Sequence, residues 1–164
     1  MDLGGLPIPD TRPVFLAALA LHLLAAGTAV LAGVAATTAP KRPGRHPRAG
    51  AIYLWAVTAV LGTALVLGTM RWREDRLLVG LALVTAGLAW TGRAVRRRGR
   101  PGWPLRHGLA MASSYTVLFI GFYVDNGPHL PGWDRLPPPA YWLLPAAVAT
   151  PLTWRALVRH RDVG

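Results

Sequence analysis

Five long apolar blocks, separated by short polar connections, run along the 164-residue chain. They cover residues 13–39, 50–70, 77–95, 105–124 and 141–158. A helix needs about 20 mostly apolar residues to cross the hydrocarbon core of a bilayer, and the blocks are close to or above that length. The fifth block is interrupted by Pro145 and Pro151. The pattern predicts an all-α fold, with residues 1–164 forming a single membrane domain of five transmembrane helices.

The connections between the blocks alternate in charge. In chain order, the N-terminal segment, the four connections and the C-terminal tail carry net side-chain charges of −1, +4, +1, +6, −1 and +2. Because cytoplasmic loops of membrane proteins are enriched in Lys and Arg, the alternation predicts an outside N-terminus and a cytoplasmic C-terminus. The rival interpretation of the first block is a cleaved signal peptide, since VAATTA resembles a cleavage site. The N-terminus lacks the basic segment that such a peptide needs.

The composition indicates which partners to expect. Hydrophobic residues make up 52 % of the chain and charged residues 15 %, and the net charge is +11. In a soluble protein this charge would suggest nucleic acid, but here the Arg residues lie almost wholly between apolar blocks. The predicted partners are therefore the lipid bilayer and either further copies of the chain or a larger membrane complex, without nucleic acid. One Lys against seventeen Arg indicates a GC-rich coding bias, so the choice of Arg over Lys carries little functional information.

Small residues and one imidazole share a face of the first block. They recur at steps of three and four: Ala18, His22, Ala26, Ala29, Gly33 and Ala36. Helices in lipid associate through small residues and interhelical hydrogen bonds, so this face is expected to line the bundle. In the fourth block a polar face runs through His107, Met111, Ser114, Leu118, Gly121 and Asp125. We predict that His22, Ser113, Ser114 and Tyr115 are buried polar residues, with His22 bonded to one of the other three.

The blocks end in aromatic residues, as expected for the two surfaces of a membrane. Those at or near the predicted ends are Trp72, Trp103, Trp133, Tyr141, Trp142 and Trp154. Trp and Tyr are enriched at this level of the bilayer, where they form an aromatic belt. The Pro-rich segment 127–139 between the last two blocks is expected to be stiff and to cap the outer face.

Two stretches of the chain resemble an uncharacterised family of small bacterial multi-pass membrane proteins. They are RHPRAGAIYLW (45–55) and RHGLAMASSYTVLFIGFYVDN (106–126), followed by YWLLP (141–145). The positions that carry the resemblance are His22, His46, Gly50, Tyr53, His107, Met111, Ser114, Tyr115, Asn126 and Pro145. The chain departs from the pattern at Ala112 and Ser113, where larger residues are common. The resemblance covers most of residues 15–150 and implies an integral membrane protein with no established activity. Together with the apolar blocks it predicts a multi-pass location in a bacterial plasma membrane.

Haem b is the sharpest chemical hypothesis for the polar residues. Membrane cytochromes hold this cofactor between two His side chains of neighbouring helices. His46 and His107 lie at the cytoplasmic ends of two predicted spans that run in the same direction, so their depths match. Nearby arginines could pair with the propionates: Arg45, Arg48 and Arg106. Against haem, His46 precedes Pro47 and is expected just before its helix. The alternative is that both His residues belong to the basic flank of the membrane.

Other chemistry has less support in the sequence. The absence of Cys excludes disulfides and thiol catalysis, and no His or Asp spacing indicates a metal site. A small proton or solute transporter subunit is an alternative because His22 is ionisable and lies at mid-depth. No Asp, Glu or Lys lies deep enough to complete a proton relay with it. The sequence therefore predicts a non-enzymatic integral membrane protein with a partner or assembly role and no catalytic residues.

Overall fold

The computed structural model describes residues 2–3, 6–7, 10–40 and 43–161, with side chains for 10–40 and 43–155. Lys41 and Arg42, which were counted in the first basic connection, lie outside these residues. Five helices make up nearly all of the described chain: α1 (Pro13–Thr38), α2 (Arg45–Met70), α3 (Trp72–Arg98), α4 (Trp103–Asn126) and α5 (Pro138–Arg161). Two-residue strands, β1 (Asp2–Leu3) and β2 (Leu6–Pro7), pair antiparallel. The all-α prediction is confirmed.

Four of the helices, α1 to α4, are long and apolar enough to cross a membrane. Helices α2, α3 and α4 begin two to five residues before the predicted blocks, because helical hydrogen bonding extends beyond the strictly apolar part. The fifth block is also helical, and α5 continues through both Pro145 and Pro151. A proline lacks the N–H that would bond one turn back, so α5 forgoes two of its own hydrogen bonds.

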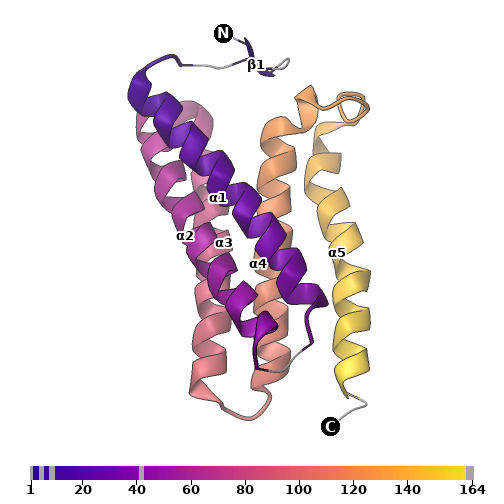
Figure 1. Cartoon of the computed structure of the whole chain (residues 1–164). Helices are drawn as coiled ribbons and strands as arrows, with labels where there is room; N and C mark the ends of the chain where they lie inside the picture. The colour runs from indigo at the N-terminus through magenta and orange to yellow at the C-terminus, as the bar shows by residue number, and fades with distance from the viewer. Residues whose placement is uncertain (1, 4–5, 8–9, 41–42, 162–164) are drawn as a thin grey trace. The chain divides into compact units, whose positions relative to one another are not determined.

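The chain divides into two compact units, Met1–Ala86 and Gly87–Gly164, and α3 contributes to both. In the first unit α1 and α2 lie side by side as an antiparallel pair (Figure 1). Phe15 and Ala18 near the start of α1 form a buried cluster with Leu67 near the end of α2.

The small-residue face predicted for the first block lies in this unit. On it Ala18, Ala29 and Gly33 are buried, whereas the other small residues and His22 are half-buried. The opposite sides of α1 expose large apolar side chains, of which Leu31 is 72 % exposed. The prediction that the small-residue face lines the packed side of the helix is confirmed.

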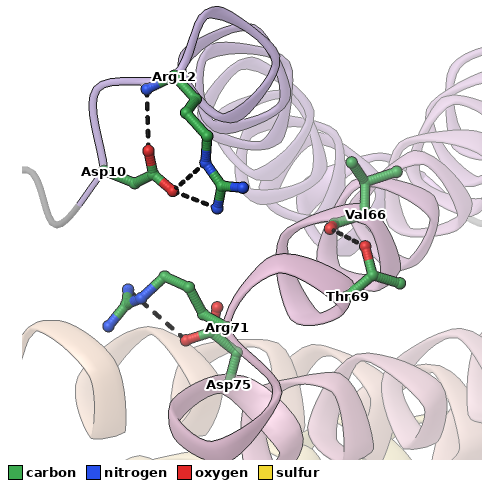
Figure 2. Close-up of polar contacts among 6 residues, drawn as sticks. All are labelled: Asp10, Arg12, Val66, Thr69, Arg71 and Asp75. Atoms are coloured by element: carbon green, nitrogen blue, oxygen red, sulfur yellow. Dashed lines mark hydrogen bonds and ion pairs between the residues drawn. The ribbon is translucent and has the colours of Figure 1, made fainter.

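Two ion pairs lie at the end of the first unit where α1 begins (Figure 2). Arg12, just before α1, donates from its Nε to Asp10 at 2.7 Å, and its backbone N–H donates to the same carboxylate. These bonds hold the pKa of Asp10 below its usual value. Their contribution to stability is therefore present at neutral pH and is lost as the pH falls through that lowered pKa. Arg71, the single residue between α2 and α3, lies 3.8 Å from Asp75 in the first turn of α3.

In the second unit α4 contacts the C-terminal part of α3, and α5 runs beside α4. A 3₁₀ helix, η1 (Gly127–His129), follows α4 directly. Tyr141, which the sequence assigns to the aromatic belt, is buried instead, because its hydroxyl donates to the carbonyl oxygens of Trp133 and Leu136. Tyr141 therefore links segment 127–139 to α5, and the stiffness of this segment stays a prediction.

Candidate functional site

The imidazoles of His22, His46 and His107 each join two consecutive helices. His22 in α1 bonds to α2, His46 in α2 bonds to α1, and His107 in α4 bonds to α3. In each case the bonding atom is Nδ1. The three side chains that the sequence suggests for chemistry are therefore each held by a neighbouring helix.

His46 lies inside the first turn of α2, which corrects the expectation that it precedes the helix. The helix begins at Arg45, and Pro47 is tolerated at the third position because first-turn N–H groups have no intrahelical partner. The Nδ1 atom of His46 lies 2.8 Å from the carbonyl oxygen of Ala36, near the end of α1. A carbonyl oxygen only accepts, so the proton of this imidazole is on Nδ1. The orientation of His46 is therefore fixed by a neighbouring helix.

His107 makes the equivalent bond in the second unit. Its Nδ1 donates to the carbonyl oxygen of Gly92 in α3 at 2.9 Å. Gly92 is buried, and a Cβ there would lie 2.9 Å from the Sδ of Met111 and 3.4 Å from the Cβ of Ala110. Glycine at this position allows α3 and α4 to approach closely enough for the bond to form. The ring of Trp103, one turn earlier, lies 6.2 Å from that of His107.

His22 bonds to Thr63 of α2, and this corrects the prediction of a partner among Ser113, Ser114 and Tyr115. The Nδ1 of His22 lies 2.9 Å from the Oγ1 of Thr63. The Thr63 hydroxyl donates to the backbone carbonyls of its own helix, so its oxygen accepts from the imidazole. The partner comes from α2 because α1 and α2 are packed along their length, and sequence patterns alone do not identify which helices are neighbours.

The polar residues of α4 differ in burial. Ser114 is fully buried, at 0 % exposure, and Tyr115 is half-buried against the ring of Phe119, with ring centroids 5.0 Å apart. Ser113 is exposed, which corrects its predicted burial. Successive residues of an α-helix point about 100° apart, so Ser113 and Ser114 cannot both face the same neighbour.

Ser113 instead lines a groove between α4 and α5. The groove has a volume of about 370 Å³, and small side chains form much of both walls, among them Ala112 and Thr116 from α4 and Ala146 and Ala149 from α5. The hydroxyl of Thr116 donates to the carbonyl oxygen of Ala112 within α4. This surface is therefore mostly apolar and made of short side chains, a composition typical of helix contacts in lipid.

The haem hypothesis for His46 and His107 stays a prediction. A neutral imidazole with its proton on Nδ1 has its lone pair on Nε2, which is the atom that would bind iron. The two residues belong to different units of the chain. Among the described residues there is also no group of three or more His, Asp or Glu side chains that could hold a metal ion.

Two substitutions distinguish the structural role of His107, its hydrogen bond to Gly92, from a role as a haem ligand. In His107→Asn the side-chain N–H₂ is attached to Cγ, as Nδ1 is in His, so the bond to Gly92 can be kept. In His107→Gln the group lies one atom further out. We expect unfolding in detergent to show His107→Asn close to the unchanged protein and His107→Gln lower in free energy of unfolding by about 1 kcal/mol.

Both variants lack the imidazole ring and its Nε2 lone pair, so absorption spectra after haem-supplemented expression provide the control for this prediction. A Soret band of the unchanged protein that disappears in His107→Asn and His107→Gln alike would favour the haem hypothesis. Equal stability of the two variants would show that the bond to Gly92 contributes nothing. His46→Asn and His46→Gln repeat the experiment in the first unit.

Comparison of the chain with protein-family models, with curated proteins and with solved structures finds no match.

Proposed function

We propose that this chain is a non-enzymatic, multi-pass membrane protein that acts as a partner or assembly factor in a larger membrane complex. The observation that carries the proposal is that the imidazoles of His22, His46 and His107 all form hydrogen bonds between consecutive helices. The three side chains best suited to ligand binding or proton transfer thus have a structural role, which accounts for their presence. The proposed site of action is the plasma membrane of a bacterium.

The α4–α5 groove supports the partner role. In lipid there is little hydrophobic force between helices, and association depends on the close approach that small residues permit. The walls of the groove contain Ala112, Ala146 and Ala149, and the hydroxyls of Thr116 and Thr150 are bonded within their own helices. A transmembrane helix of the partner protein is therefore the proposed occupant.

Purification of the tagged chain in a mild detergent, after cross-linking in the membrane, tests this role. We expect a partner to accompany the unchanged protein and to be lost from Ala149→Leu, which fills the groove. Ala147→Leu is the matched control, because Ala147 is an exposed residue of the same helix outside the groove lining. Recovery of the chain alone would contradict the proposal, and recovery of only further copies of itself would replace the partner by a homo-oligomer.

The proposed topology has five spans, an outside N-terminus and a cytoplasmic C-terminus. It is supported by the charge alternation along the chain. Six arginines lie at the end of α3, in the loop and at the start of α4: Arg93, Arg96, Arg97, Arg98, Arg100 and Arg106. Reporter fusions are expected to report the segment between α3 and α4 as cytoplasmic and segment 127–137 as outside. An outward-facing segment between α3 and α4 would overturn this orientation, and equal locations of the two segments would contradict a span at α4.

A further inference from the structure

A small basic pocket lies where α3 ends and α4 begins. The two helices are joined by four residues, and Gly99 and Gly102 take positive φ angles of 58° and 76° within this turn. The pocket has a volume of about 80 Å³ and is lined by Val95, Arg98, Arg100, Trp103 and Arg106. The tight turn therefore brings three arginines, one from each helix and one from the loop, to the lining of one cavity.

The segment of the chain that forms this pocket carries no acidic side chain. The sequence between Asp75 and Asp125 contains no Asp or Glu, and three further arginines lie on the last turns of α3. Among the described residues, none of the pocket arginines takes part in an ion pair. Three like charges around one cavity repel one another, and an anion placed between them would remove that repulsion.

The start of α4 adds to the positive potential. Gly102 occupies the N-cap position and provides no side-chain hydrogen bond to the first-turn N–H groups. The N-terminus of a helix carries a partial positive charge, which favours a nearby anion. The first turn of α4 contains Trp103 and Arg106, both of which line the pocket. The start of the helix and the three arginines thus both favour a negatively charged ligand.

The size of the pocket selects the chemistry of that ligand. Sites for drug-sized ligands have volumes of about 300–1,000 Å³, so a cavity of about 80 Å³ is too small for a nucleotide or a haem. A phosphate group is a compact anion, and the planar fork of Arg matches its oxygens. Trp103 is half-buried at the end of a membrane-length helix, where aromatic rings sit at headgroup level.

We propose that Arg98, Arg100 and Arg106 bind the phosphate of an anionic lipid headgroup in this pocket. The proposal rests on the membrane location given under the proposed function but not on a protein partner. Basic pockets between the ends of membrane helices suit such headgroups because the lipid brings its phosphate to the level of the helix ends. The lipid would fix the turn between α3 and α4 relative to the membrane surface.

The test measures lipid binding to the delipidated full chain in detergent at about 0.15 M salt, for example by native mass spectrometry. The probes are phosphatidylglycerol, phosphatidylcholine and inorganic phosphate. We expect phosphatidylglycerol to bind about tenfold or more tightly than phosphatidylcholine. Binding of inorganic phosphate without that lipid preference would assign the pocket to a soluble anion and overturn the lipid proposal.

Two triple variants separate the pocket from the general charge of the segment. Arg98→Gln/Arg100→Gln/Arg106→Gln removes the pocket arginines, and Arg93→Gln/Arg96→Gln/Arg97→Gln removes the same charge from residues that do not line it. We expect the first variant to lose affinity for phosphatidylglycerol by about tenfold or more and the second by less than about threefold. Equal losses would show diffuse attraction to lipid and overturn the pocket. Since the assay contains no other protein, a failed partner search leaves its result intact.

Discussion

Replacing Tyr141 by Ala is expected to lower the free energy of unfolding by about 3–5 kcal/mol, the usual cost of removing a large buried aromatic side chain. Tyr141 is only 6 % exposed, and its ring packs directly against Gly127. Its hydroxyl donates to the carbonyl oxygens of Trp133 and Leu136 at 3.0 and 3.3 Å. One side chain therefore fills the space between η1 and α5 and also holds the segment that joins them.

Unfolding of the purified chain in detergent, followed by circular dichroism, measures this effect. Tyr141→Phe keeps the ring and removes the two hydrogen bonds, so a loss of about 1 kcal/mol is expected. Trp142→Ala is the control, because it removes an aromatic ring of similar size from the next residue, which is exposed. If Trp142→Ala and Tyr141→Ala cost the same, the ring of Tyr141 has no special role in holding the segment.

Gly68→Ala is expected to destabilise the first unit by about 1–3 kcal/mol through overpacking. A Cβ at Gly68 in α2 would lie 2.6 Å from the Cγ2 of Val79 in α3. Val79 is buried, and a β-branched side chain in a helix has one strongly preferred rotamer, so it cannot turn away. The added methyl group therefore forces the two helices apart or strains one of them.

Gly62→Ala is the matched control for this prediction. It lies in the same helix, and a Cβ there would have no atom within 4 Å outside the immediate backbone. Alanine favours a helix more than glycine does, so this variant should be neutral or slightly more stable. The double variant Gly68→Ala/Val79→Ala should recover part of the loss, because it removes the methyl group that clashes. A Gly68→Ala protein as stable as Gly62→Ala would contradict the close contact of α2 with α3.

The helices could be predicted from the sequence because each depends on a local pattern. The apolar blocks identified α1 to α5, and the steps of three and four identified the packed face of α1, with Ala29 and Gly33 buried on it. The limits of the helices were less predictable. Helix α2 begins at Arg45, outside its apolar block, since helical hydrogen bonding does not require an apolar side chain. Helix α4 begins at Trp103 because the first turn of a helix tolerates Pro104.

The partners of the polar side chains could not be predicted in the same way. His22 was expected to bond to the fourth block and bonds to Thr63, because the choice depends on which helices pack together. Tyr141 has the residue type and the position expected for the aromatic belt. Its ring packs against Gly127 instead, a contact that no apolar pattern indicates. The acceptors of His46 and His107 are backbone carbonyls, which every residue carries and no pattern distinguishes.

The two histidine–carbonyl bonds also bear on the order in which the chain is assembled. Ala36 and His46 are 10 residues apart in the sequence, and Gly92 and His107 are 15 apart. Contacts between residues so close in sequence form early, and N-terminal parts of a chain fold first during synthesis. Each bond can therefore form while the C-terminal part of the chain is still being synthesised. The pair of consecutive helices, rather than the single helix, is then the smallest part of the chain that such a bond can stabilise.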